Sequence, residues 1–427
     1  MEKTRREDFL HYVWKFSLFE KEGLVTNDGQ PIRIVSHGTH NQDAGPDFVD
    51  ARIHIGHTLW AGNVEIHHRA SDWFRHGHGQ DVAYDSVILH VVEHDDQQVR
   101  RTCGTLVPSL TLKFNTALLD NYEQLLRTKR WVFCDESIAG VPGLVKEAWL
   151  ERMVVERLER KTSSIEASLA ETSNDWAAAF YVALARSFGA SVNADAFEAL
   201  ARSLPYACLA KHKSSLLQLE ALLFGQAGML EGSHGDEYPA DLAREYSFLR
   251  NKFCLEPMDA SAWKFMRMRP SNFPTIRIAQ FARLLNTSST LLSKIIETGT
   301  VGELKGFFNV TASPYWDTHY RFGKESKSAR KHMGDVGAGT ILVNTVIPFI
   351  FIYGKMNGQP TLQERAVEFL GRLPFEQNQV TSRWVGKVPG CDNAARSQAL
   401  IHLEKQYCLG GRCLQCAIGS CVVRTLG

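Results

Sequence analysis

The chain has 427 residues, of which 44% are hydrophobic, and its 48 basic and 47 acidic side chains leave a net charge of +1. This composition excludes a disordered, collagen-like or low-complexity chain. It also argues against a nucleic-acid coat protein that is basic throughout, although a local basic patch is compatible with it. At roughly 100–200 residues per domain, the length predicts two or three domains.

The sequence predicts neither a membrane span nor a secretion signal. The longest apolar run, 341–353, carries Asn344 and Pro348, and a membrane-spanning helix needs about 20 apolar residues. The N-terminus is charged and lacks the apolar core of a signal peptide. We therefore expect a cytoplasmic protein without membrane contact. Four scattered cysteines are then expected to be reduced core residues: Cys103, Cys134, Cys208 and Cys254.

The first 112 residues are predicted to form an α-β-β-β-α-β core. Apolar residues recur at helical spacing near the N-terminus, and alternating apolar segments follow. A later, nearly continuous apolar run is typical of a buried central strand. The predicted segments are a helix at 7–19, strands at 31–36, 48–56 and 58–67, a short polar helix, and strands at 86–93 and 105–112.

From residue 113 onward, helical periodicity dominates, and Gly, Pro and Asn occupy the turns. No fixed repeat period is present, so a regular solenoid is not expected. We predict three parts: a nuclease-like domain at 1–112, a mainly helical domain with basic segments at 113–380, and a helix with a cysteine-rich tail at 381–427. Helices are predicted at 116–126, 144–169, 175–188, 194–204, 214–224, 240–249, 275–285, 290–297, 301–308, 362–370 and 394–406.

Two carboxylates and an imidazole are expected to converge in the N-terminal part. Asp47 opens the strand at 48–56, whereas Glu65 and His67 lie near the end of the next strand. Because they are two residues apart, Glu65 and His67 project from the same face. A hairpin at Gly56-His57 would place Asp47 beside them. Hard cations such as Mg²⁺ bind carboxylates and can activate a water, so the pattern predicts a divalent-metal site.

The pattern P-D…E-x-H in this order of elements resembles the PD-(D/E)xK nuclease superfamily. The resemblance implies that Asp47 and Glu65 bind Mg²⁺ or Mn²⁺, and that the main-chain carbonyl of Ile66 completes the site. His67 stands where the superfamily has lysine, so its role in catalysis depends on its protonation state. An acidic residue of the N-terminal helix assists in some members, which makes Glu7 a further catalytic candidate.

Histidines concentrate in the same region: 11 of the 16 lie between His11 and His94. The alternative to a functional role is plain: the HGHGQ segment could be a surface loop, and a histidine in a buried strand is more often a satisfied core residue. A separate zinc pair in that segment lacks a clear set of thiol or carboxylate partners in the sequence. The further site candidates are Asn41, His76, His78, Tyr84 and His90.

Longer strings resemble a widespread bacterial family of uncharacterised proteins, classed only as a domain of unknown function. These strings are AGPDF, GNVEIH and YDSVILHVV near the N-terminus, RMRPSNFPTIR in the middle, and CLQCAIG near the C-terminus. The resemblance extends over almost the full length and implies no established activity.

Two basic segments predict contacts with nucleic-acid phosphates. Residues 260–296 contain six basic side chains and no Asp or Glu, and arginine matches phosphate geometry. An extended stretch would point Arg267 and Arg269 the same way. The second segment, 321–331, follows the aromatic residues Tyr315, Trp316 and Tyr320, which could stack bases. Alternatively, these cations anchor helix ends and acidic loops. The candidates are Arg267, Arg269, Arg277, Lys324, Lys327 and Arg330.

The C-terminal cysteines predict a structural metal site. Their C-x4-C-x2-C-x4-C spacing is compact, and thiols of a reduced protein bind metal rather than form disulfides. Zinc is expected, with an iron–sulfur cluster as the alternative, because the spacing resembles loops that pin the C-termini of some DNA-repair nucleases and glycosylases. Cys391 or His402 could replace the last ligand, and four reduced thiols capping a helix end are the plain alternative. The predicted ligands are Cys408, Cys413, Cys416 and Cys421.

Together these patterns predict a divalent-metal-dependent nuclease that acts on DNA rather than RNA. Two alternatives remain at this level. The first is a nuclease-like scaffold that binds nucleic acid without cutting it, because the lysine is replaced. The second is a metal-dependent hydrolase of small phosphoesters that uses the histidine-rich segment. The sequence leaves the oligomeric state open.

Overall fold

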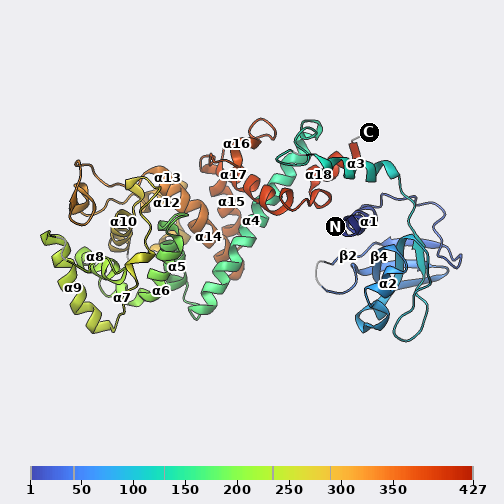
Figure 1. Ribbon diagram of the computed structural model, residues 1–427, viewed down its shortest axis with the longest axis horizontal. Coiled ribbons are helices and arrows are strands. Elements are labelled where there is room, and N and C mark those ends of the chain that lie inside the picture. The colour runs from blue at the N-terminus through green and yellow to red at the C-terminus, as the bar shows by residue number, and fades with distance from the viewer. Residues whose placement is uncertain (1, 42–43, 129, 233–234, 289, 426–427) are drawn as a thin grey trace. The chain divides into compact units, whose positions relative to one another are not determined.

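The computed structural model describes residues 2–41, 44–128, 130–232, 235–288 and 290–425, with side chains from Arg6 onward. The protein is a mixed α/β chain in which an N-terminal curled sheet precedes a largely helical region. Contacts divide it into two units, Met1–Trp149 with Leu403–Gly427, and Leu150–His402 (Figure 1). These limits differ from those predicted at 112 and 380, and the cysteine-rich tail groups with the sheet.

The sheet of the first unit has the strand order β1-β3-β4-β5-β6, and β2 pairs with β3. Strand β3 is antiparallel to both β1 and β4, whereas β4, β5 and β6 run parallel. The elements are α1 (Glu2–Lys15), β1 (Ile32–Ser36), β2 (Thr39–His40), β3 (Phe48–Ile55), β4 (Thr58–Arg69), α2 (Asp72–Arg75), β5 (Val87–His94), β6 (Ser109–Thr111), α3 (Thr116–Arg127) and α18 (Ala417–Thr425).

Burial explains why these segments pair as they do. The first six residues of β5 are all buried, as expected of a strand covered on both faces. Gly56 takes a φ of +58° in the turn between β3 and β4. At Gly62 a Cβ would lie 2.7 Å from the Ser86 carbonyl oxygen, so glycine allows β4 to approach β5. The last strand is shorter than predicted and covers only Ser109–Thr111.

Helix α1 begins earlier and ends earlier than the predicted 7–19. It stops at Lys15 because Ser17 adopts a left-handed φ of +54°. Phe9, Leu10, Val13 and Trp14 are fully buried, so one apolar face of α1 lies against the protein and fixes which side chains the helix presents to β4.

The second unit is built around nearly fully buried helices. Most residues of α5, α8, α10 and α14 are buried. The elements are α4 (Gly143–Glu171, shared with the first unit), α5 (Trp176–Phe188), α6 (Ala194–Ser203), α7 (Tyr206–Ala210), α8 (Leu216–Gln226), α9 (Glu237–Phe253), α10 (Pro274–Thr287), α11 (Leu291–Glu297), α12 (Val301–Phe307), β7 (His319–Arg321), β8 (Lys324–Glu325), α13 (Asp335–Ile341), α14 (Ile347–Met356), α15 (Pro360–Arg372), α16 (Thr381–Trp384) and α17 (Ala394–Leu403).

One long helix, Asp335–Met356, was not predicted. It is apolar and long enough to cross a membrane by composition alone, but 67% of its most apolar window is buried inside the protein, as in the core helix of a globular domain. A π-helical turn, Leu342–Val346, lies just before Pro348. Since proline has no N–H to donate, a widened turn accommodates it within the helix.

Candidate functional site

The predicted pair of carboxylates comes together at the β3–β4 hairpin. The main-chain N–H of Asp47 donates to Glu65 Oε2 over 3.1 Å, and the N–H of Ile66 donates to Asp47 Oδ2 over 2.9 Å. Glu65 is only 4% exposed. Its burial and the nearby Asp47 carboxylate raise the pKa of Glu65 to about 9. A bound cation would offset both effects, because it favours the charged form.

His11, which was not among the predicted site residues, adds an imidazole from helix α1. Its Nε2 lies 3.1 Å from Asp47 Oδ2. Burial opposes protonation, but the Asp47 carboxylate outweighs it, so the pKa of His11 is raised. The signal in the sequence was its position four residues after Glu7, which places both side chains on one face of the helix.

Three histidines gather on the other side of Glu65. Ligand nitrogens of His67, His76 and His78 all lie within 4.8 Å of one another. Glu65 Oε1 is 3.1 Å from His78 Nε2 and 3.5 Å from His67 Nε2. The sequence showed no partners for the pair His76 and His78; the fold supplies Glu65 and His67.

Burial keeps the imidazoles of His67, His78 and the neighbouring His90 neutral. It lowers the pKa of His67, with His90 adding to the effect, and it lowers the pKa of His90 to about 3. Nδ1 of His67 lies 2.8 Å from Nε2 of His90, so one of these two nitrogens carries the shared proton. The pKa of His78 is likewise lowered by burial. Neutral imidazole is the form that binds metal ions.

Tyr84 covers His78, with ring centroids 3.8 Å apart. Burial, and then the Glu65 charge, raise the pKa of this phenol to about 12, so it acts as a neutral wall of the site. Asn41 donates to the carbonyl of Pro46 over 3.1 Å and therefore braces the loop before Asp47.

Glu7 is the weakest of the predicted catalytic residues. Burial raises the pKa of its carboxyl group, His76 and His11 lower it, and Asp72 and Asp47 raise it further. These interactions place Glu7 within electrostatic range of both the carboxylates and the histidines. No hydrogen bond to its carboxyl group is present among the described residues, so the catalytic role of Glu7 stays a prediction.

The arrangement therefore offers two ligand sets that share Glu65. One consists of Asp47 and Glu65, with His11 beside them, and suits a hard cation. The other consists of Glu65 with His67, His76 and His78, and suits borderline ions such as Zn²⁺. Ile66 participates through its N–H; the role predicted for its carbonyl stays a prediction.

The pattern of a known family extends over most of the chain and includes all of these residues. The family is described as "Protein of unknown function (DUF2851)", and it matches residues 7–379. The chain belongs to this family. The resemblance to an uncharacterised family is thus confirmed, although the match ends before the cysteine-rich tail. No curated protein and no solved structure matches the chain.

Of the predicted nucleic-acid contacts in the second unit, some are exposed cations, and one already donates hydrogen bonds within the protein. Arg267 and Arg269 are exposed, but Arg267 has a left-handed φ of +60° in a turn, so the expected extended stretch is wrong. Arg277 donates to Asn272 over 2.7 Å and to Gln280 over 3.2 Å, and burial lowers its pKa. Arg277 therefore holds α10 in place. Lys324 and Lys327 are exposed.

The aromatic residues before the second basic segment do not form the predicted stacking surface. Trp316 is fully buried. Tyr315 stacks on His319 with ring centroids 4.1 Å apart and donates to Asp236 over 2.6 Å. Tyr320 has the Lys331 ammonium 4.1 Å from its ring. The rings of Tyr315 and Tyr320 are therefore already in contact with neighbouring side chains.

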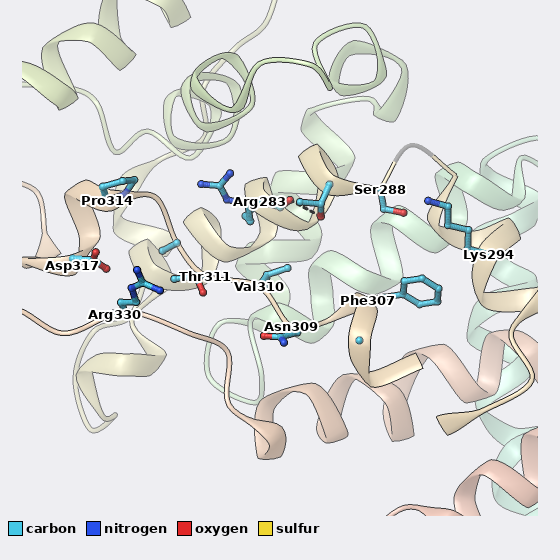
Figure 2. A pocket seen from close by; sticks show the side chains of 13 residues that line it. Arg283, Ser288, Lys294, Phe307, Asn309, Val310, Thr311, Pro314, Asp317 and Arg330 are labelled. Carbon is cyan, nitrogen blue, oxygen red and sulfur yellow. Dashed lines mark hydrogen bonds between the residues drawn. The ribbon is translucent and has the colours of Figure 1, made fainter. Parts of the chain in front are cut away.

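Arg330 instead lines a pocket of about 500 Å³ with Arg283 of α10 and Lys294 of α11. Figure 2 shows both arginines at the end of the pocket that also holds Asp317, and Lys294 near Ser288 at the other end. In the part of the chain that the structure describes, none of the three cations forms an ion pair. The Ser288 hydroxyl is buried without a hydrogen-bond partner. Such a pocket suits an anion with several acceptor oxygens.

A further cysteine, Cys134, lies within electrostatic range of three of the four predicted C-terminal ligands, and the metal site itself stays a prediction. Cys408, Cys413 and Cys416 each interact electrostatically with Cys134, whereas Cys421 lies half-buried on α18. The two alternative ligands belong to the second unit. There the Cys391 thiol donates to the Val388 carbonyl over 3.8 Å, and His402 Nε2 lies 3.4 Å from Glu156 Oε2. Sequence spacing could not indicate Cys134, because this residue is far away along the chain.

Proposed function

We propose that the protein is a divalent-metal-dependent phosphodiesterase that cleaves nucleic acid. The observation that carries the proposal is the mutual bonding of Asp47 and Glu65 beside neutral imidazoles. Two adjacent carboxylates, one of them buried and with its pKa raised, are a poor arrangement for an apo protein and a good one for a cation.

The order of elements supports the same function. A helix precedes antiparallel strands β3 and β4, and β5 runs parallel to β4, with the acidic residues at the β3–β4 pair. This is the arrangement expected from the resemblance to PD-(D/E)xK nucleases. The departure from that pattern is His67, because a neutral, buried imidazole cannot supply the positive charge of a lysine.

Each residue of the site would have a distinct role in the reaction. A bound cation would polarise the phosphate and lower the pKa of an attacking water. Asp47 and Glu65 would hold that cation, and His11 would orient Asp47. His67 has one ring nitrogen occupied by His90 and the other facing Glu65 and His76. We therefore assign His67 to ligation rather than to proton transfer, and we expect Mn²⁺ or Zn²⁺ to be accepted along with Mg²⁺.

Cations of the second unit would bind the substrate backbone. Arg283, Lys294 and Arg330 line one pocket without ion-pair partners among the described residues, and Arg267 and Arg269 are exposed. Phosphate contacts of this kind dominate nucleic-acid affinity. This distribution favours a polymeric substrate over a small phosphoester, which would need only the residues around Glu65.

A cleavage assay tests the proposal. Labelled single- and double-stranded DNA and RNA would be incubated with Mg²⁺, Mn²⁺, Zn²⁺ or EDTA. We expect metal-dependent cutting that falls at least about 100-fold in an Asp47→Asn/Glu65→Gln variant, while His57→Ala, an exposed turn residue, behaves like the wild type. Absence of cutting with salt-sensitive binding would favour the binding scaffold. Turnover of small phosphoesters alone would favour the third alternative.

A further inference from the structure

Two distant parts of the sequence bring four cysteines near one another in the first unit. Cys134, Cys413 and Cys416 are 8%, 7% and 6% exposed, and Cys408 is partly buried. Cys134 precedes the other three by more than half the chain. In a reduced protein, several cysteines held near one another indicate metal binding rather than disulfides.

The C-terminal loop is shaped so that three of these residues follow one tight turn. A π-helical turn, Glu404–Cys408, ends at the first cysteine. The N–H of Gly411 donates to the Cys408 carbonyl over 3.1 Å, and the N–H of Cys416 donates to the Cys413 carbonyl over 3.3 Å. Gly411 takes a φ of +66°, which favours glycine and lets the backbone reverse between the cysteines.

The loop is seated directly against the segment that carries Cys134. A Cβ on Gly411 would lie 3.6 Å from the ring of Phe133, the neighbour of Cys134. The rings of Trp149 and Tyr407 contact each other edge to face, with centroids 5.3 Å apart, and the Trp149 indole lies against the Cys416 thiol. Aromatic side chains therefore enclose the group from both segments.

The thiols are near one another without being in closed contact. Cys408, Cys413 and Cys416 each have Cys134 within electrostatic range. In the part of the chain that the structure describes, no three of these sulfurs all lie within 4.8 Å of one another. They would therefore close around a single zinc ion, or hold the larger iron–sulfur cluster at a wider spacing.

We propose that Cys134, Cys408, Cys413 and Cys416 bind a four-thiolate metal centre. Zn²⁺ and an iron–sulfur cluster share this donor set, and the experiment below separates them. The centre would fasten the C-terminal tail to the sheet-bearing part of the unit. Hydrogen bonds already connect the same partners: Tyr12 Oη lies 3.0 Å from Ser420 Oγ, and Asn121 donates to the Val423 carbonyl over 3.0 Å.

The test compares two single substitutions in the full-length protein purified without oxygen. Zinc, iron and acid-labile sulfide would be measured per chain, together with visible absorption. We expect the wild type and Cys421→Ser to carry the same metal, and Cys134→Ser to lose at least about 90% of it, since four ligands complete either type of site. Iron with sulfide and visible absorption would identify a cluster; zinc without them would identify a mononuclear site.

X-ray absorption of the wild type provides a second readout, because Cys134→Ser could fail to fold. We expect only sulfur from the protein in the first coordination shell. A nitrogen ligand, retention of metal by Cys134→Ser, equal loss in Cys421→Ser, or a wild type without either metal would each overturn the proposal. None of these measurements depends on nuclease activity, so the result stands apart from the function proposed for Asp47 and Glu65.

Discussion

Asp47 and Glu65 hold each other in place across the β3–β4 pair: the Asp47 N–H donates to the Glu65 carboxyl group over 3.1 Å, and the N–H of the residue after Glu65 donates to Asp47 over 2.9 Å. Each acidic side chain thus accepts a bond from the main chain at the other. The two carboxyl groups are positioned before any ligand arrives, which lowers the cost of ordering a site.

Because of these bonds, we expect that the charge of Glu65 can be removed while its side chain keeps its position. Glu65→Gln keeps an oxygen for the Asp47 N–H and removes the charge. The raised pKa of about 9 leaves Glu65 protonated in the folded apo protein at neutral pH, whereas the unfolded chain has lost that proton. Because glutamine does not titrate, we expect the variant to gain on the order of 3 kcal/mol of unfolding free energy at about pH 7. Cation affinity should nevertheless fall at least tenfold. Calorimetry with Mn²⁺, beside thermal unfolding, measures both; a large loss of stability would contradict the reasoning.

His76 provides a test of the nitrogen-rich ligand set, because it is exposed and its removal should not disturb the core. We expect His76→Ala to weaken binding of Zn²⁺ or Mn²⁺ by about 10- to 100-fold and to leave Mg²⁺ binding nearly unchanged, since imidazole suits the former ions. His57→Ala is the matched control. Equal effects on all three ions would show that His76 acts through the fold of its loop.

Much of the sheet, but less of the site, was predictable from the sequence. Strands β3 and β4 follow from alternating apolar residues and the Gly56 turn, and they alone place Asp47 beside Glu65. Cys134 lies near its group through tertiary packing, which leaves no trace in local spacing, and the spacing of His11 shows only that it shares a helix face with Glu7. A pattern read within one segment therefore finds the partners on a hairpin and misses those contributed by a distant element.

The missed helix Asp335–Met356 has a different physical reason. Its first part contains Gly337 and Gly339, and Pro348 lies in its interior, all of which have poor helix propensity. Burial of the surrounding apolar residues overrides that propensity. The π-helical turn also leaves the Val343 carbonyl available, and the Lys161 ammonium donates to it over 3.3 Å and to Asn344 over 2.8 Å.

The pocket in the second unit predicts how binding depends on salt. We expect Arg283→Ala/Arg330→Ala to weaken binding of a single-stranded oligonucleotide and to reduce the slope of log affinity against log salt by about 1.4, because each phosphate contact contributes about 0.7 for single strands. Lys355→Ala, an exposed cation outside the pocket, is the control. Fluorescence anisotropy at several salt concentrations measures the slope; an unchanged slope would exclude these arginines from phosphate contact.

Glu220 of α8, within electrostatic range of Arg283, predicts a pH dependence of stability. It is 1% exposed and accepts a bond from the Tyr238 hydroxyl over 2.8 Å. Burial raises its pKa from 4.5 to about 7, although Ser313, Tyr238 and Arg283 oppose the shift. Between these values the folded protein keeps a proton that the unfolded chain has lost. This contribution to stability is complete below the unfolded pKa and is lost as the pH rises through about 7.

Glu220→Gln should therefore remove that loss, because glutamine does not titrate and its oxygen can still accept from Tyr238. We expect the variant to gain on the order of 2–3 kcal/mol over the wild type between about pH 5 and pH 8. Urea denaturation followed by circular dichroism at several pH values measures the difference. Glu364→Gln, on the exposed surface of α15, controls for the loss of a charge. Parallel pH profiles of wild type and Glu220→Gln would mean that the pKa of the buried carboxyl group is not raised above that of the unfolded chain, which would contradict the prediction.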